Sequence, residues 1–142
     1  MAKVGFHYAD VNANIVKGKK QVKEFIRYIF NSEGKTLDEI NYIFCSDPYL
    51  LEINKSYLQH DFYTDIITFD LSNGEEVVGE VYISIDRVRD NAKLHGSTYR
   101  EELLRVIFHG VLHLVGYKDK KKSEITIMRE KEDYYLRLFE QK

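Results

Sequence analysis

Three residues in the C-terminal third of the chain have the types and the spacing of metal ligands. His109 and His113 are four residues apart, which puts two imidazoles on one face of a helix about one turn apart. Gly116 and Asp119 follow at intervals of three, so that the segment reads HGVLHLVGYKD. A glycine can adopt positive φ, end the helix and turn the chain so that the carboxylate of Asp119 returns to the ion.

Two imidazoles and one carboxylate are a ligand set for a divalent cation. Zinc is the best match, and manganese, iron or nickel are lesser ones. Two histidines on a buried helix could instead be hydrogen-bonded core groups, but the added glycine and carboxylate favour the metal interpretation. Three protein ligands leave a position for water, which is typical of catalytic zinc. We therefore predict one metal ion, most simply Zn²⁺, held by His109, His113 and Asp119, and a hydrolytic reaction through the bound water.

The residue after the first histidine restricts the class of hydrolysis. Metalloproteases with the pattern H-E-x-x-H-x-x-G-x-x-H carry their general base there, whereas this chain has Gly110. Hydrolysis of a phosphodiester depends less on such a base, because a metal and nearby cations stabilise the developing charge. The pattern therefore favours phosphoryl chemistry, and a metallopeptidase is the least favoured alternative.

Apolar periodicity predicts the elements that must position these residues. A helix that begins with a capping box at Thr98 and Glu101 and runs to about 115 is apolar almost all round, so it should be central and buried. Asp47 and Asp86 are expected to be the N-caps of two other helices. The sequence predicts strands at 3–8, 39–46, 65–71 and 76–85, and further helices at 19–34, 47–57, 86–95 and 123–139. We expect a single α+β domain over 1–142, with a mixed four-stranded sheet, a buried central metal-binding helix and flanking helices.

Composition and charge exclude several classes of protein. The chain is 44% apolar and 31% charged, as in ordinary globular proteins, and it has no apolar stretch of the roughly 20 residues that a bilayer requires. No secretory signal is visible, so the cytoplasm is the expected compartment, and the single cysteine, Cys45, is expected to be a buried thiol.

A formal net charge of −2 argues against a surface that binds nucleic acid everywhere, but it allows a local basic patch. Two sets of cations are candidates: Lys118, Lys120, Lys121 and Lys122, and Arg87, Arg89, Lys93, Arg100 and Arg105. Charge runs are usually solvated, and this is our expectation for the second set. The lysines flank Asp119 and should border the metal site, which favours phosphate contact for them.

Three segments together resemble the YbeY endoribonuclease and rRNA maturation family. Residues 109–117 are similar to its signature, H-G-x-L-H-L-x-G-Y-D-H. Residues 54–70, NKSYLQHDFYTDIITFD, match its block N-x-x-Y-R-x-x-D-x-P-T-D-V-L-S-F, and residues 79–83 align with its G-D-I segment. The segments occur in the family order, and the resemblance covers most of the chain.

The resemblance implies a single-strand-specific endoribonuclease that acts in 3′-end maturation of small-subunit rRNA and in ribosome quality control. It also implies a zinc-like ion, an α+β fold with the metal helix under a cleft, and RNA and the small ribosomal subunit as partners, with ribosome-associated proteins left open. Four positions depart from the family pattern. Asp119 replaces the third histidine, Lys118 replaces the preceding aspartate, Tyr63 replaces a proline, and Leu58 replaces an arginine that contacts substrate.

The remaining candidates keep two interpretations each. Thr64 and Asp65 either cap a turn or line the cleft and bind substrate. Glu80 is either a general base near the metal or a surface residue, and no other catalytic side chain is assigned. Leu58 supports the alternative function, a non-catalytic ribosome-biogenesis binding factor in which the metal is structural.

Overall fold

The computed structural model describes residues 2–141 and contains an α+β fold, as the sequence predicts. Its elements are, in chain order, β1 (Lys3–Tyr8), α1 (Lys19–Ser32), β2 (Leu37–Cys45), α2 (Asp47–Leu58), β3 (Ile66–Asp70), β4 (Val77–Ser84), α3 (Ile85–His95), α4 (Tyr99–Leu114) and α5 (Lys122–Glu140). The expected mixed sheet is confirmed, with the strand order β1-β2-β4-β3. The pairs β1–β2 and β2–β4 are parallel, whereas β3 and β4 form the predicted antiparallel hairpin.

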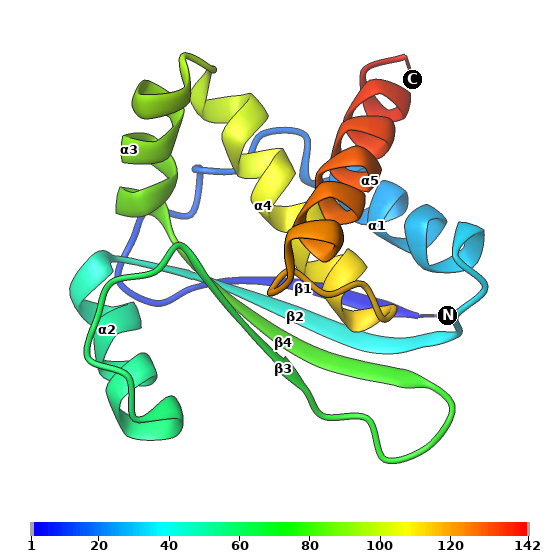
Figure 1. Cartoon of the computed structure of the whole chain (residues 1–142), viewed down its shortest axis with the longest axis horizontal. Coiled ribbons are helices and arrows are strands. Elements are labelled where there is room, and N and C mark those ends of the chain that lie inside the picture. The colour runs from blue at the N-terminus through cyan, green and yellow to red at the C-terminus, as the bar shows by residue number, and fades with distance from the viewer. Residues whose placement is uncertain (1, 142) are drawn as a thin grey trace.

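The helices α1, α3, α4 and α5 lie on one side of the sheet, and α2 lies on the other (Figure 1). The main core forms between the first group of helices and the sheet. Ten of the 16 residues of α4 are buried, and eight of them belong to this core. A smaller cluster forms where Leu50 of α2 packs against Cys45 and Ile67. The prediction of a buried central helix is confirmed, including its capping box at Thr98 and Glu101.

Two glycines allow α4 to approach β4 closely. A Cβ atom at Gly110 would lie 3.0 Å from Val81 Cγ1, and one at Gly79 would lie 2.6 Å from Leu114 Cδ1. The backbone of α4 therefore sits closer to the strand than larger side chains at these two positions would allow.

The N-caps of α2 and α3 differ from the prediction. Ser46 and Ser84 cap these helices with their hydroxyl groups, so the assignment of Asp47 and Asp86 as N-caps is wrong. The two aspartates instead form hydrogen bonds between the N-terminus of α2 and that of α3. Asp47 Oδ1 accepts a 2.6 Å hydrogen bond from Ser84 Oγ, and Asp86 Oδ2 accepts one of 2.8 Å from the Asp47 backbone N–H. A serine directly before an aspartate offers two capping side chains, and tertiary contacts decide which one caps.

Cys45 is buried, as expected, and burial raises the pKa of its thiol to about 12. None of the helices within residues 2–141 is both long and apolar enough to cross a membrane.

Candidate metal site and cleft

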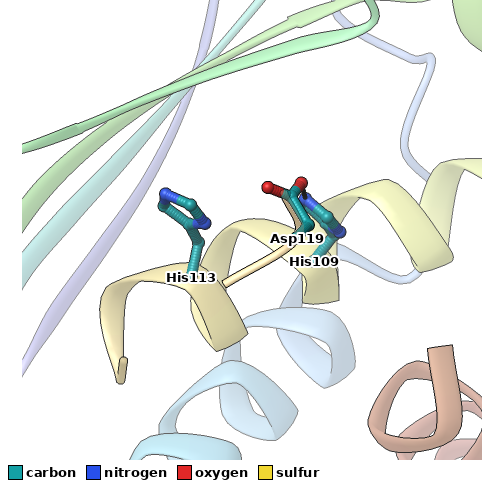
Figure 2. Close-up of side chains that lie close together, drawn as sticks. All are labelled: His109, His113 and Asp119. Carbon is teal, nitrogen blue, oxygen red and sulfur yellow. Dashed lines mark ion pairs between the residues drawn. The ribbon is translucent and has the colours of Figure 1, made fainter. Parts of the chain in front are cut away.

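The structure brings the three predicted ligands together at the C-terminal end of α4. The imidazoles of His109 and His113 rise from one side of the helix, and the Asp119 carboxylate lies beside His109 (Figure 2). The two ring centroids are 6.3 Å apart, with planes inclined by 16°. Asp119 Oδ2 lies 3.2 Å from His109 Nε2, and one ligand atom of each residue falls within 4.8 Å of the others. Such a cluster could hold one divalent ion.

Gly116 creates the turn that returns Asp119 to the helix. Its φ of 114° lies in the region that favours glycine, as the sequence predicts. The Tyr117 N–H donates to the Leu112 carbonyl at 3.0 Å, and the Gly116 N–H donates to the His113 carbonyl at 3.1 Å. These bonds satisfy the last carbonyl groups of α4 and fix the direction in which the chain leaves the helix.

Glu132 of α5 is hydrogen-bonded to the ring nitrogen of His109 that does not face Asp119. Its Oε2 lies 2.7 Å from His109 Nδ1, so the Nε2 atom is the one that faces Asp119. Metal-binding histidines commonly have their second nitrogen bonded to a carboxylate in this way, which sets the tautomer and the ring orientation. Burial disfavours the charged imidazole, but the hydrogen bond and the charge of Glu132 outweigh it and raise the pKa of His109.

Arg105 continues this chain of contacts. Its Nη1 donates to Glu132 Oε1 at 2.8 Å, and its Nη2 donates to Asp133 Oδ1 at 2.6 Å. The expectation that Arg105 is a solvated surface charge is therefore wrong. Sequence reasoning missed Glu132, although a signal exists: it lies on the buried stripe of α5 together with Met128 and Tyr135, where a carboxylate needs a partner.

A second network anchors the loop that carries Asp119. Tyr117 in this loop donates to Glu33 Oε1 at 2.8 Å, and Tyr135 and Lys131 of α5 donate to Glu33 Oε2. Burial alone would raise the pKa of Glu33, but these three hydrogen bonds outweigh it and hold the pKa below its ordinary value. The loop is thus tied to the end of α1 and to α5.

Two of the three candidate ligands, His109 and Asp119, line a cleft of about 400 Å³, and His113 lies outside its lining. Four segments line it: the turn before β3, α3, one face of α4, and the loop and helix around α5. The lining residues are Thr64, Asp65, Ile66, Asn91, His95, Glu102, Arg105, Val106, His109, Asp119, Ile125, Met128, Arg129 and Glu132. Thr64 and Asp65 therefore lie where the cleft interpretation of the sequence puts them. Burial raises the pKa of Asp65, and the charge of His109 acts in the opposite direction.

Glu80 is not brought to this cleft. Val81 contacts the Gly110 position of α4, and neighbouring side chains of a strand point to opposite faces. Glu80 therefore lies on the face opposite α4, where its carboxylate accepts a 3.3 Å hydrogen bond from Tyr82. Of the two interpretations of Glu80, the structure supports the one in which it is remote from the candidate ligands.

The other departures and cations also lie outside the cleft lining. Leu58 is the last residue of α2, 40% exposed, and α2 covers the other side of the sheet. Lys118, Lys120, Lys121 and Lys122 flank Asp119 and are exposed. Arg87 is paired with Asp47. The basic residues that do line the cleft, apart from its histidines, are Arg105 and Arg129.

Gly110 also bears on the peptidase alternative. Because the Cα–Cβ direction at this position points into β4, a glutamate here would meet Val81 rather than face the ligands. The structure thus offers no place beside His109 for the general base of the metalloprotease pattern.

Comparison with known proteins shows the family to which the chain is similar. The family model described as Endoribonuclease YbeY matches residues 6–140. A protein of Flavobacterium psychrophilum named Endoribonuclease YbeY is 54% identical over 115 residues, which are 81% of this chain and 82% of the relative. A relative of the same name from Christiangramia forsetii is 40% identical over 139 residues, which are 98% of this chain and 97% of the relative.

A solved structure shares the fold. The solution structure of TM1509 from Thermotoga maritima aligns with a TM-score of 0.65 at 28% identity, over 98% of this chain and 89% of that chain. The match of the family model spans all three segments on which the resemblance was based, together with the helix that supplies Glu132. The chain belongs to the YbeY endoribonuclease family.

Proposed function

We propose that this protein is a metal-dependent endoribonuclease that cleaves single-stranded RNA with one divalent ion, most simply zinc, at His109, His113 and Asp119. The observation that carries the proposal is the convergence of these three side chains, two of which line a cleft, in a chain whose relatives are named endoribonucleases. The ligand set of two imidazoles and one carboxylate fits a catalytic zinc.

Residues in and around the cleft have distinct roles in the proposed reaction. A divalent ion, when bound, polarises a phosphodiester and lowers the pKa of a water molecule. Glu132 orients His109 through its Nδ1 atom, and the Tyr117–Glu33 hydrogen bond holds the Asp119 loop in place. These contacts fix the ligands before substrate arrives, and such preorganisation is a main source of catalytic power.

Asp65 is the side chain to which we assign proton transfer. It is neither a candidate ligand nor a partner of His109 Nδ1, yet it lines the same cleft. Because burial raises the pKa of its carboxyl group, it is a better proton acceptor than an exposed aspartate. In this role it replaces Glu80, which lies on the other face of the sheet.

Basic residues around the cleft are assigned to the RNA backbone. Arg129 lines the cleft, and among residues 2–141 it has no ion pair. Lys118, Lys120, Lys121 and Lys122 are exposed beside Asp119, where they can contact the phosphates of RNA nucleotides that lie outside the cleft. For the substrate, we propose the 3′ end of small-subunit rRNA, in the cytoplasm and within the small subunit. Leu58 does not favour the alternative of a non-catalytic binding factor, because its position lies outside the cleft lining.

The test is cleavage of a 3′-extended small-subunit rRNA, both free and in assembled subunits. Wild type stripped of metal and then loaded with Zn²⁺, Mn²⁺, Fe²⁺ or Ni²⁺ is compared with His113→Ala. His60→Ala removes an exposed histidine that is not part of the candidate ligand cluster and is the matched control. We expect cleavage and about one bound ion per chain in wild type and control, and loss of both in His113→Ala. Equal cleavage by all three proteins would overturn the proposal.

A further inference from the structure

The end of the cleft that lies away from the ligands contains a buried carboxylate with no hydrogen-bond partner. Glu102 lies seven residues before His109 on the same face of α4, which is about 10 Å along the helix axis. It is 6% exposed and lines the cleft. The nearest basic group is His95 Nδ1, 3.6 Å from Glu102 Oε1, which is beyond hydrogen-bond length.

The side chain of Glu102 is largely buried, but its oxygens are not among the fully enclosed polar atoms that lack a partner within residues 2–141, so they are open to the cleft. Glu102 lies in the first turn of α4, where a negative charge is favourable, and it is within ion-pair distance of His95, but among residues 2–141 it accepts no side-chain hydrogen bond. Glu132, on the facing helix, provides the contrast: it is equally buried but is bonded to both Arg105 and His109. Glu102 therefore has acceptor capacity that a ligand in the cleft can use.

The surroundings of Glu102 are those of a small polar pocket with apolar walls. Asn91 and His95 reach the cleft from α3, and the Asn91 amide has no hydrogen bond within the part of the chain that the structure describes. Val106 of α4 and Met128 of α5, both buried, contribute apolar surface to the lining. A cleft of about 400 Å³ falls in the range of small-molecule sites and has room for a nucleotide.

We propose that this end of the cleft is a recognition site for an unpaired guanine base of the RNA substrate. The proposal rests on the proposed function. The Watson–Crick edge of guanine presents two adjacent donors, N1–H and the N2 amino group, to the two oxygens of Glu102. Its O6 atom accepts from the side-chain amide of Asn91. The base plane packs between Val106 and Met128, and the phosphate lies toward His109.

The carboxylate excludes the other bases by chemistry. Adenine and cytosine each present one amino donor beside a ring-nitrogen acceptor, which would face a carboxylate oxygen without a proton between them. Uracil presents one N–H flanked by two carbonyl oxygens. A site built to bond a donor strongly rejects analogues that lack it, because its buried polar group is then left unpaired. In a duplex this edge of guanine is occupied by cytosine, so the same contact would also exclude paired RNA.

Binding of short RNAs tests the proposal without any need for cleavage. The probes are uridine-only single strands in which one central nucleotide is guanosine, inosine or adenosine, and binding is followed by fluorescence anisotropy with metal-free protein. Inosine lacks only the N2 amino group. We expect the guanosine probe to bind about tenfold more tightly than the inosine and adenosine probes. Equal affinity for the three probes would overturn the proposal, and this comparison uses wild-type protein alone.

Substitution of the carboxylate gives a second, directional test. In Glu102→Gln an amide can accept from N6 of adenine and donate to N1, so we expect the preference to shift from guanosine toward adenosine. Glu130→Gln, on the exposed side of α5, is the matched control and should keep the guanosine preference. A Glu102→Gln protein that melts like wild type and retains the full guanosine preference would contradict the assignment.

The outcomes separate this site from the proposed function. Cleavage that depends on His113, together with binding that does not distinguish guanosine from inosine, refutes the guanine site and leaves the nuclease intact. A guanosine preference that depends on Glu102, in a protein that cleaves no RNA with any of the four metals, supports the binding site and refutes the nuclease.

Discussion

The Nδ1 atom of His109 and the Oε2 atom of Glu132 are 2.7 Å apart, and this hydrogen bond joins α4 to α5 directly behind the candidate metal site. Glu132 is 5% exposed, and its other oxygen is bonded to Arg105. The carboxylate therefore has both oxygens committed, and the imidazole has one nitrogen left for an ion. The position of the C-terminal helix is thereby coupled to the orientation of a ligand.

Glu132→Gln tests this coupling. We expect the affinity for Zn²⁺ to fall about 10- to 100-fold, because the amide no longer holds the imidazole as a charged acceptor. Competition with a chromophoric chelator measures the affinity. Asp133→Asn is the matched control, since Asp133 contacts Arg105 but not His109 in the structure. Equal losses in the two variants would show that the Arg105 pairing, and not the bond to His109, matters for metal binding.

Gly116→Ala tests the turn that returns Asp119 to the helix. A side chain at φ 114° is strained even though the space around it is open, so we expect a loss of about 1–2 kcal/mol in the free energy of unfolding. We also expect weaker Zn²⁺ binding, because a change in the turn displaces the third ligand. Urea denaturation of metal-free and metal-loaded protein measures both effects. If Zn²⁺ raises the free energy of unfolding by the same amount in Gly116→Ala as in wild type, the turn does not position Asp119.

The stability contributed by Glu33 should depend on pH. Its folded-state pKa lies below the ordinary value of 4.5, so its hydrogen bonds stabilise the fold above that pH, and the contribution is lost as the pH falls through the folded-state pKa. At pH 7 we expect Glu33→Gln to lower the free energy of unfolding by about 1–3 kcal/mol. The difference from wild type should shrink below pH 4.5, as urea denaturation at a series of pH values can show. A difference that does not vary with pH would indicate a loss of packing instead, and Glu130→Gln serves as the control.

Arg129 should contribute to RNA binding through its charge. We expect Arg129→Gln to weaken the binding of single-stranded RNA for every sequence and to reduce the slope of log affinity against log salt by about one. Fluorescence anisotropy at several salt concentrations gives both quantities. The comparison is Arg137→Gln on the same helix, which removes the same charge outside the metal cleft. If the slope changes equally in both, the effect is one of net charge and not of the cleft.

The elements of the fold could be predicted from the sequence because their signals are local. The apolar periodicity of α1 and α4, the capping box at Thr98 and the hairpin between β3 and β4 depend on residues a few positions apart. The clustering of the three candidate ligands could be predicted for the same reason, since a helix and one glycine suffice to bring them together. The N-caps of α2 and α3 could not, because Asp47 and Asp86 are bonded across the two helices.

The surroundings of the site required the tertiary structure. Glu132 is 23 residues from His109, and no local pattern relates the two positions. Alternation along β4 shows that Glu80 and Val81 point to opposite faces of the sheet, but it does not show which face α4 covers. The contact between the Gly110 position and Val81 shows that α4 covers the face of Val81, so Glu80 lies on the other face. The cleft residues come from four separate segments, so the placement of Asp65 and Glu102 in one cleft is visible only in the folded protein.

The candidate ligands share one short stretch of chain, residues 109–119, whereas the groups that restrain them, Glu132 and Glu33, come from elsewhere. Closing so short a loop costs little entropy and is fast compared with the assembly of a sheet. The stretch can therefore capture an ion while the chain is still folding, before the last helix has packed. An ion held at that stage would present the free nitrogen of His109 to Glu132 and so guide the final helix into place. If the chain folds in this order, metal present during refolding would raise the yield of folded protein.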